Sequence, residues 1–448
     1  MTSGNIYRHL LAYSVPIFLG SIMQMLYNIV DTIIVGRFIG MEAMAAVGAT
    51  GMVTNIALYL FLGFSVGAGV IVGQIFGAKE NGALREVTQT IIAFTLILCA
   101  VFTVVGYALS DKILRLIKTP DDVFPYSLTY LHIYFIGISG MLIYNIGGEI
   151  LRSVGNSTMP LIFLAVSSAI NIILDIISVV VLHAGVAGVA WATAISQFAS
   201  AAMVMVMLST TKEVYRLEWR GLHINFPLLK RMLSIGLPSC IQSVITAFTN
   251  LLAQTYINLL GSACMAGWSC FNKLLGICMM PTIAFSAASA VFVSQNFGAK
   301  QFARVKAGIR KSVIMNIGSS AVISIAMFVF AEALIGIFTD DAEAIHFGAM
   351  FIHWVILSMI YYCIGETLTR SMMGMGDSKA PTAIKLVFYV GLRLALLVAI
   401  STALAITPIS VSLVFVVSWA IGTAALFLYY KIHWAKRLSQ LQAETNPC

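Results

Sequence analysis

The chain has 448 residues, of which 60% are hydrophobic and only 10% are charged. Soluble domains carry about 25% charged residues, because a soluble surface must be hydrated, and disordered chains are polar and poor in aromatic residues. The composition therefore excludes both classes and predicts an integral membrane protein. A net charge of +8 would suggest a nucleic-acid partner for a soluble protein, but here the basic residues separate long apolar runs, so we expect no nucleic-acid binding.

Apolar runs of about 20 residues recur along the chain, which is typical of transmembrane helices and not of a β-barrel. The first run is too long for a signal peptide and ends without a cleavage site, so we expect it to remain as a helix. We predict an all-α integral membrane protein with twelve transmembrane helices. They cover residues 10–36, 47–76, 88–110, 125–148, 160–182, 186–209, 232–260, 270–297, 311–335, 345–369, 381–403 and 409–431.

The basic residues orient these helices. If both termini are cytoplasmic, twenty Lys and Arg residues fall on the inner side and four fall on the outer side. This asymmetry follows the positive-inside rule, so we expect a multi-pass protein of the cytoplasmic (inner) membrane with both termini in the cytoplasm. The seven cysteines are scattered without a CxxC pair, and we expect them to be small core residues without a disulfide or a metal site.

Two sequence motifs occur twice. GQIFGAK at residues 73–79 returns as SQNFGAK at 294–300, and GNSTMP at 155–160 returns as GDSKAP at 376–381, each displaced by 221 residues. Repetition at a displacement of half the chain predicts a duplicated fold.

The repeat predicts two parallel six-helix lobes, at residues 1–209 and 232–435. A basic cytoplasmic linker at 210–231 joins them, and a cytoplasmic tail follows at 436–448. Parallel repeats are found in secondary transporters that work by alternating access.

Two carboxylates lie inside apolar segments, Asp31 in the first and Asp175 in the fifth. Ionisable side chains at membrane depth are costly and mark ion or substrate pathways. Carboxylate, amide and hydroxyl oxygens suit a hard cation such as Na⁺, and the carboxylates also suit a proton. The predicted cation site comprises side chains that helical spacing places on the same faces, with further oxygen and amide partners from the fourth and sixth helices: Asp31, Asp175, Asn171, Thr193, Tyr27 and Asn145.

The two carboxylates occur in one lobe only, since the repeat places Ala253 and Leu396 at the equivalent positions. This asymmetry favours a specialised cation site; the alternative is that each Asp braces neighbouring helices. Pro16 lacks a backbone N–H and should allow the first helix to bend. We expect four polar side chains to line a substrate cavity: Gln24, Asn28, Asn250 and Gln254.

Charged side chains also occur in other helices. Glu149 precedes Arg152 and Glu366 precedes Arg370 near the inner helix ends, so these residues form either ion pairs that hold one conformation or simply solvated helix ends. Arg393 lies midway along the eleventh helix without an identifiable partner, and we expect it to be structural.

Motifs of soluble enzymes are not supported. Gly63, Ser65 and Gly67 spell G-x-S-x-G, but they lie inside an apolar helix with no strand before it. The sequence contains no Walker motif and no compact set of His and Cys ligands. We therefore expect no enzymatic activity and no cofactor, and no metal beyond Na⁺ at Asp31 and Asp175.

The stretch YNIVDTIIVGRFIG, the GQIFGAK and SQNFGAK repeats and the loop LRSVGNSTMP resemble the multidrug and toxic compound extrusion (MATE) family over essentially the whole chain. Thr246 stands where the NorM-like branch has an acidic residue, so the chain resembles the DinF-like branch. The resemblance implies two lobes in a V around a central cavity. It also implies a site made of the residues that match the branch motif: Tyr27, Asp31, Asn145, Asn171, Asp175 and Thr193, with Gly148 where the family has a second Asn of the fourth helix.

We therefore predict a secondary active antiporter, monomeric in the lipid bilayer, that exports organic cations, amphipathic drugs or toxic metabolites. The coupling ion is H⁺ or Na⁺. The alternative is a flippase of the same superfamily for lipid-linked oligosaccharides or peptidoglycan precursors, which should line its cavity with arginine.

Overall fold

The computed structural model describes residues 1–403 and 406–445, and within these ranges every regular element is helical. Twelve spans in the described residues are long and apolar enough to cross a membrane, which confirms the predicted number. Helices satisfy their own backbone hydrogen bonds, and this is what a chain surrounded by lipid requires.

The first half of the chain forms six long helices: α1 (Ile6–Phe38), α2 (Met41–Ala78), α3 (Asn81–Leu116), α4 (Phe124–Ser153), α5 (Thr158–Asp175) and α6 (Gly185–Thr210). A π-helical segment, Ile176–Val181, continues α5 directly after Asp175. A short 3-10 turn at Trp219–Gly221 lies in the connection to the second half.

The second half begins with α7 (Phe226–Asn258), α8 (Ser262–Gly298) and α9 (Phe302–Val329). The helices that follow are divided by short irregular segments: α10 (Ala331–Gly336), α11 (Ala342–Val355), a 3-10 turn (Ile356–Ser358), α12 (Met359–Gly374), α13 (Lys379–Lys385), a π-helical segment (Leu386–Leu392), α14 (Arg393–Ala403), α15 (Pro408–Tyr429), a second π-helical segment (Tyr430–Trp434) and α16 (Ala435–Thr445).

The chain folds into two compact units. The N-terminal unit contains Leu19–Gly236, and the C-terminal unit contains Met1–Phe18 together with the residues from Leu237 onward. Both α1 and α7 therefore change unit along their length, within a few residues of Pro16 and Pro238 respectively.

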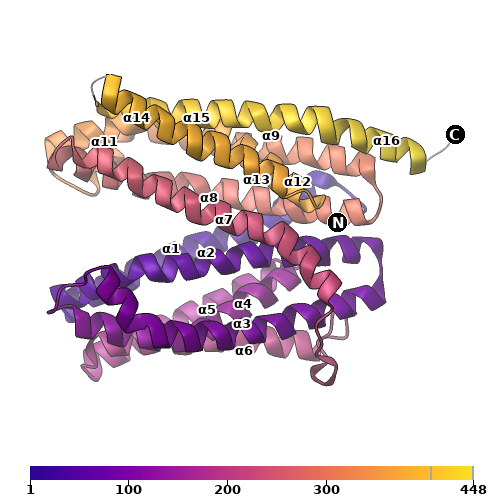
Figure 1. Cartoon of the computed structure of the whole chain (residues 1–448), viewed down its shortest axis with the longest axis horizontal. Coiled ribbons are helices and arrows are strands. Elements are labelled where there is room, and N and C mark those ends of the chain that lie inside the picture. Colours follow the sequence, from indigo (N-terminus) through magenta and orange to yellow (C-terminus); the bar gives the residue numbers. More distant parts are fainter. Residues whose placement is uncertain (404–405, 446–448) are drawn as a thin grey trace. The chain divides into compact units, whose positions relative to one another are not determined.

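In the N-terminal unit, α4 packs against α2, α3 and α6 (Figure 1). The first turns of α7 approach α2 closely: a Cβ atom added to Gly236 would lie 2.5 Å from the carbonyl oxygen of Gly63. This distance is well below van der Waals contact, so only glycine allows the two backbones to pack at this separation.

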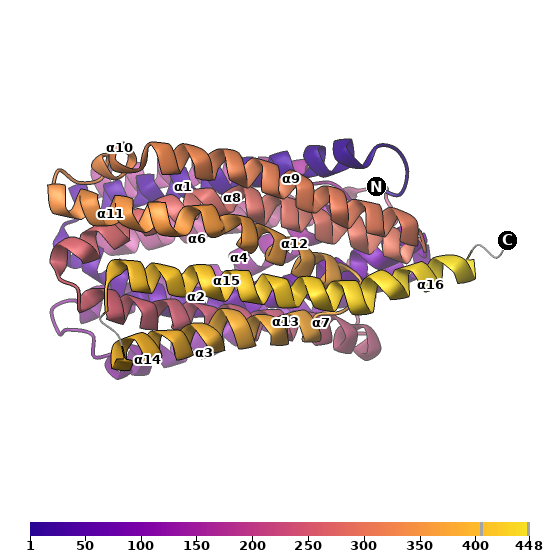
Figure 2. The same cartoon turned by 90° about the horizontal axis from the view of Figure 1, so that it is seen from above.

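In the C-terminal unit, α8 packs against α9, α11 and α12 (Figure 2). Buried aromatic rings form its centre, with Trp268 in contact with Phe271, Phe351 and Phe415. The N-terminus is held on this unit by Arg304, whose guanidinium donates hydrogen bonds to the carbonyl oxygens of residues 1, 3 and 4 at 2.9–3.3 Å.

The segment between α6 and α7 packs against the N-terminal unit. Tyr215 and Leu217 are buried in its core, and Arg85 of α3 pairs with Glu218 at 3.2 Å.

Of the two interpretations for the charged helix ends, the structure shows the ion pairs. The guanidinium of Arg152 lies 2.8 Å from the carboxylate of Glu149, and that of Arg370 lies 3.1 Å from the carboxylate of Glu366. Six cysteines are buried with free thiols, while Cys448 lies outside the described residues: Cys99, Cys240, Cys264, Cys270, Cys278 and Cys363.

The close packing of α7 against α2 predicts that a larger residue at position 236 destabilises the fold. Gly236→Ala should lower the free energy of unfolding by about 1–3 kcal/mol, because the new methyl group overlaps the backbone of Gly63. Gly318→Ala is the matched control, since no atom lies within 4 Å of a Cβ added there, and alanine is the better helix former by up to about 1 kcal/mol. Thermal unfolding in detergent measures both. Equal melting temperatures for the two variants would contradict the proposed packing role of Gly236.

Candidate functional site

Two helices of the N-terminal unit carry the intramembrane carboxylates. On α1, Tyr27 and Asp31 are one turn apart and share a face. On α5, Asn171 and Asp175 do the same, and Asp175 is the last α-helical residue before the π-helical segment. Such π-helical turns often occur at functional sites because they re-aim side chains and free backbone groups.

Thr193 of α6 joins these two helices. Its hydroxyl lies 3.5 Å from the Tyr27 hydroxyl and accepts a hydrogen bond of 3.5 Å from the amide of Asn171. One side chain on α6 therefore connects α1 to α5, and the structure brings together five of the six residues predicted for the cation site.

The oxygen atoms at the centre of this site lack partners. Asn171 and Asp175 are 1% and 0% exposed. One oxygen of Asp31, the amide oxygen of Asn171 and both oxygens of Asp175 are buried without a hydrogen bond. Buried polar atoms are almost always paired, because each unpaired one costs about 1–3 kcal/mol. These four oxygen atoms are an unusual concentration of unsatisfied acceptors.

The two carboxylates also lie close enough to interact electrostatically. Two like charges buried in one helix bundle destabilise the site unless a positive species neutralises them. The arrangement can therefore hold a proton on either carboxylate, or a hard monovalent cation among the carboxylate and amide oxygens.

Tyr130 of α4 belongs to the site and was not predicted from the sequence. Its phenol interacts electrostatically with both Asp31 and Asp175. Tyr130, Tyr134 and Gly137 recur at i, i+4 and i+7, so one face of α4 carries two tyrosines, and this spacing was the available signal.

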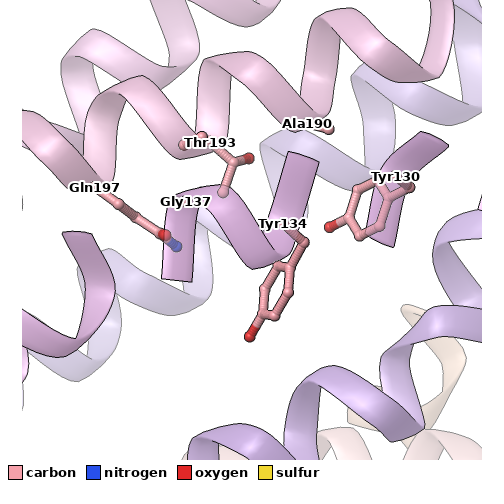
Figure 3. A pocket seen from close by; sticks show the side chains of 7 residues that line it. Tyr130, Tyr134, Gly137, Ala190, Thr193 and Gln197 are labelled. Carbon is pink, nitrogen blue, oxygen red and sulfur yellow. The ribbon is translucent and has the colours of Figure 1, made fainter. Parts of the chain in front are cut away.

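A pocket lies between α4 and α6 beside these side chains. Figure 3 shows Tyr130 and Tyr134 projecting from α4 near Thr193 of α6, with the Tyr130 hydroxyl directed into the pocket. The full lining is Tyr130, Tyr134, Gly137, Ala190, Thr193, Ala194 and Gln197. Thr193 and Tyr130 belong both to the lining of this pocket and to the candidate cation site.

Asn145, the sixth predicted residue, uses its side chain elsewhere. Its amide donates a hydrogen bond of 2.8 Å to the carbonyl oxygen of Met141 in the same helix. No hydrogen bond in the described residues joins it to either carboxylate. The fourth helix therefore reaches the site through Tyr130.

The polar residues predicted to line a cavity lie in both units. Gln24 and Asn28 are exposed on α1 of the N-terminal unit. In the C-terminal unit, Asn250 accepts a hydrogen bond of 3.2 Å from Arg393, and Gln254 donates one of 2.9 Å to Asn258.

The described residues form twelve helices of membrane-spanning length, and the N-terminal unit holds two carboxylates with unpaired oxygen atoms, as expected of a multi-pass membrane protein that handles ions or polar solutes. A family model described as MatE matches the chain twice, over residues 16–177 and 238–399. Because the two matches cover more than half of the sequence, the chain belongs to the MatE family of transporters.

Curated relatives extend over most of the chain. The probable multidrug resistance protein YoeA of Bacillus subtilis is 26% identical over 440 residues, which cover 97% of this chain and 95% of that protein. The multidrug export protein MepA of Staphylococcus aureus is 23% identical over 84% of this chain and 83% of its own length.

A solved structure shares the fold. It is described as an outward-facing conformation of a multidrug resistance MATE family transporter of the MOP superfamily, and it matches with a TM-score of 0.90 at 19% identity. The match covers 98% of this chain and 97% of that chain, so the whole helical arrangement has a counterpart of known structure.

The position of Thr193 makes a prediction about stability. Thr193→Val should lower the free energy of unfolding by about 1–3 kcal/mol, because the amide of Asn171 and the hydroxyl of Tyr27 each lose their partner. Thr210→Val on the same helix removes an exposed hydroxyl that bonds only its own helix, and we expect a change below about 0.5 kcal/mol. Denaturant unfolding in detergent compares the two, and an equal effect of both substitutions would refute the connecting role of Thr193.

Proposed function

We propose that this chain is a cation-coupled antiporter that exports organic cations, amphipathic drugs or toxic metabolites in exchange for H⁺ or Na⁺. The observation that carries the proposal is the set of four unpaired oxygen atoms on Asp31, Asn171 and Asp175. A coupling cation satisfies these acceptors and neutralises the carboxylates. The site with the cation bound and the site without it therefore differ in their affinity for a cationic substrate.

The exchange follows from competition for the same negative charge. A cationic substrate is attracted to the ionised carboxylates, and an entering proton or Na⁺ removes that attraction. Binding of one cation therefore weakens binding of the other, and this reciprocal coupling is what antiport requires.

Alternating access fits the way that α1 is built. This helix carries Asp31 in the N-terminal unit, while its first residues belong to the C-terminal unit. Pro16 removes one backbone hydrogen bond near the change of unit, which lowers the cost of bending there. We propose that cation binding at Asp31 biases the bend and so couples ion loading to access.

The membrane and the orientation remain part of the proposal. The positive-inside pattern supports the cytoplasmic (inner) membrane with both termini in the cytoplasm. The names of two relatives, a probable multidrug resistance protein and a multidrug export protein, favour drug export over the flippase alternative.

The carboxylates provide a direct test of coupling. Asp31→Asn and Asp175→Asn should each lower gradient-driven efflux of a cationic dye at least about tenfold, because typical coupling energies of 1–3 kcal/mol depend on the charge that is removed. The measurement is dye efflux from membrane vesicles under an imposed H⁺ or Na⁺ gradient. Asp121→Asn, in an exposed loop, is the control and should transport as the wild type does. Wild-type efflux by both membrane variants would exclude these carboxylates as the coupling site.

Competition between the ion and the substrate is measurable at equilibrium. Affinity for a cationic dye should fall as pH is lowered if the coupling ion is H⁺, or as Na⁺ is added if it is Na⁺, because either ion neutralises the carboxylates. The double variant Asp31→Asn, Asp175→Asn should lose this dependence. Fluorescence titration of the purified protein measures it, and a wild-type affinity that is independent of both ions would contradict antiport.

A further inference from the structure

A buried basic side chain lies in the C-terminal unit. Arg393 begins α14 directly after the π-helical segment Leu386–Leu392, and it is 3% exposed. Its Nε donates a hydrogen bond of 3.4 Å to the hydroxyl of Ser418, and its Nη1 donates one of 3.2 Å to Oδ1 of Asn250. The guanidinium lies 4.2 Å from the ring centroid of Phe415 and 5.9 Å from that of Trp419.

This charge has no anionic partner in the described part of the chain. The ion pairs found there involve other basic residues. Lys385, the other fully buried basic side chain of this unit, is paired with Glu366. An unpaired cation at membrane depth is costly and is retained where it serves ion or substrate binding. The neutral amide and the aromatic faces around Arg393 solvate its charge without neutralising it.

Arg393 lies on the helix of its lobe that corresponds to α5 of the other lobe. The two family-model matches begin 222 residues apart and the GNSTMP repeat is displaced by 221, so Arg393 corresponds to Asn171 or Ile172 and Asn250 to Asn28 or Ile29. Arg393 directly follows the π-helical segment Leu386–Leu392, whereas Asn171 lies within α5, ahead of the segment Ile176–Val181. One lobe thus carries an excess of carboxylate, and the corresponding helix of the other lobe carries an unneutralised guanidinium.

We propose that Arg393 and Asn250 form a binding site for the carboxylate of an amphipathic aromatic substrate. The guanidinium presents planar N–H donors that match a carboxylate in bidentate geometry. Asn250 is exposed, so a ligand reaches Arg393 by displacing its amide oxygen. After rotation of the amide, its N–H₂ group donates to the second carboxylate oxygen, while Phe415 and Trp419 hold the guanidinium plane in place.

The proposal extends the substrate class beyond simple organic cations and rests on the proposed export function. Substrates with both a cationic group and a carboxylate gain affinity from this site. A substrate whose carboxylate is esterified does not gain it, because the ester carries no charge to pair with the guanidinium.

The test compares a rhodamine dye that has a free carboxylate with its methyl ester. Equilibrium binding to the purified protein is measured by fluorescence for the wild type, Arg393→Gln and Arg393→Lys. Arg393→Gln should weaken binding of the acid at least about tenfold, as the loss of a charge-assisted hydrogen bond implies, and should change binding of the ester by less than about twofold. Arg393→Lys keeps the positive charge but removes the planar pair of N–H donors, so it should give an intermediate affinity for the acid.

Two controls keep the result specific. Arg310→Gln removes an exposed positive charge from the same unit and should leave both dyes unaffected. Retained ester binding by Arg393→Gln reports that the variant is folded. An equal loss of both dyes would assign Arg393 a structural role and overturn the proposal, as would unchanged binding of the acid.

The experiment separates this proposal from the export function. Asp31→Asn should abolish gradient-driven efflux while keeping the ratio of acid to ester affinity that the wild type has. If the wild type shows no gradient-driven efflux but Arg393→Gln loses acid binding selectively, the antiport proposal fails and the carboxylate site stands.

Discussion

The cost of burying charge in a medium without water is the constraint on which this structure depends. Backbone groups meet it by forming helices, and so the described residues contain helices and their connections. Side chains meet it by pairing: Glu149 with Arg152, and Glu366 with Arg370 and Lys385. Buried charged groups without an oppositely charged partner are therefore the informative exceptions, and within the described residues they occur at one place in each unit.

In the N-terminal unit the exception is negative. The charges of Asp31 and Asp175 interact, and three of their four carboxylate oxygen atoms are buried without hydrogen bonds. The hydrogen bond from Asn171 to Thr193 connects α5 to α6 beside them. This concentration of unpaired acceptors is what supports our proposal that a cation binds there. The adjacent π-helical segment after Asp175 loosens the helix where an ion would need access.

Two helices, α1 and α7, contain residues of both units, so α1 connects the cation site directly to the C-terminal unit. The residues before Leu19 belong to the C-terminal unit and are held there through Arg304, whereas Tyr27 and Asp31 on the same helix belong to the N-terminal unit. In α7 the order is reversed: its first residues belong to the N-terminal unit, where Gly236 packs against α2, and the rest belongs to the C-terminal unit. In the mechanism that we propose, a change at the cation site acts on the C-terminal unit through α1 itself, which can bend near Pro16.

The sequence by itself determined the features that depend on local periodicity. Apolar runs gave the twelve spans, and helical spacing placed Tyr27 beside Asp31 and Asn171 beside Asp175, because these relations follow from 3.6 residues per turn alone. Only the tertiary structure decided which helices meet. It made Thr193 the connection between α1 and α5, brought Tyr130 to the carboxylates while Asn145 bonded within its own helix, and surrounded Arg393 with Asn250, Ser418 and aromatic rings. Contacts between helices depend on rotation and axial shift at every interface, and no local pattern in one helix encodes the position of its neighbour.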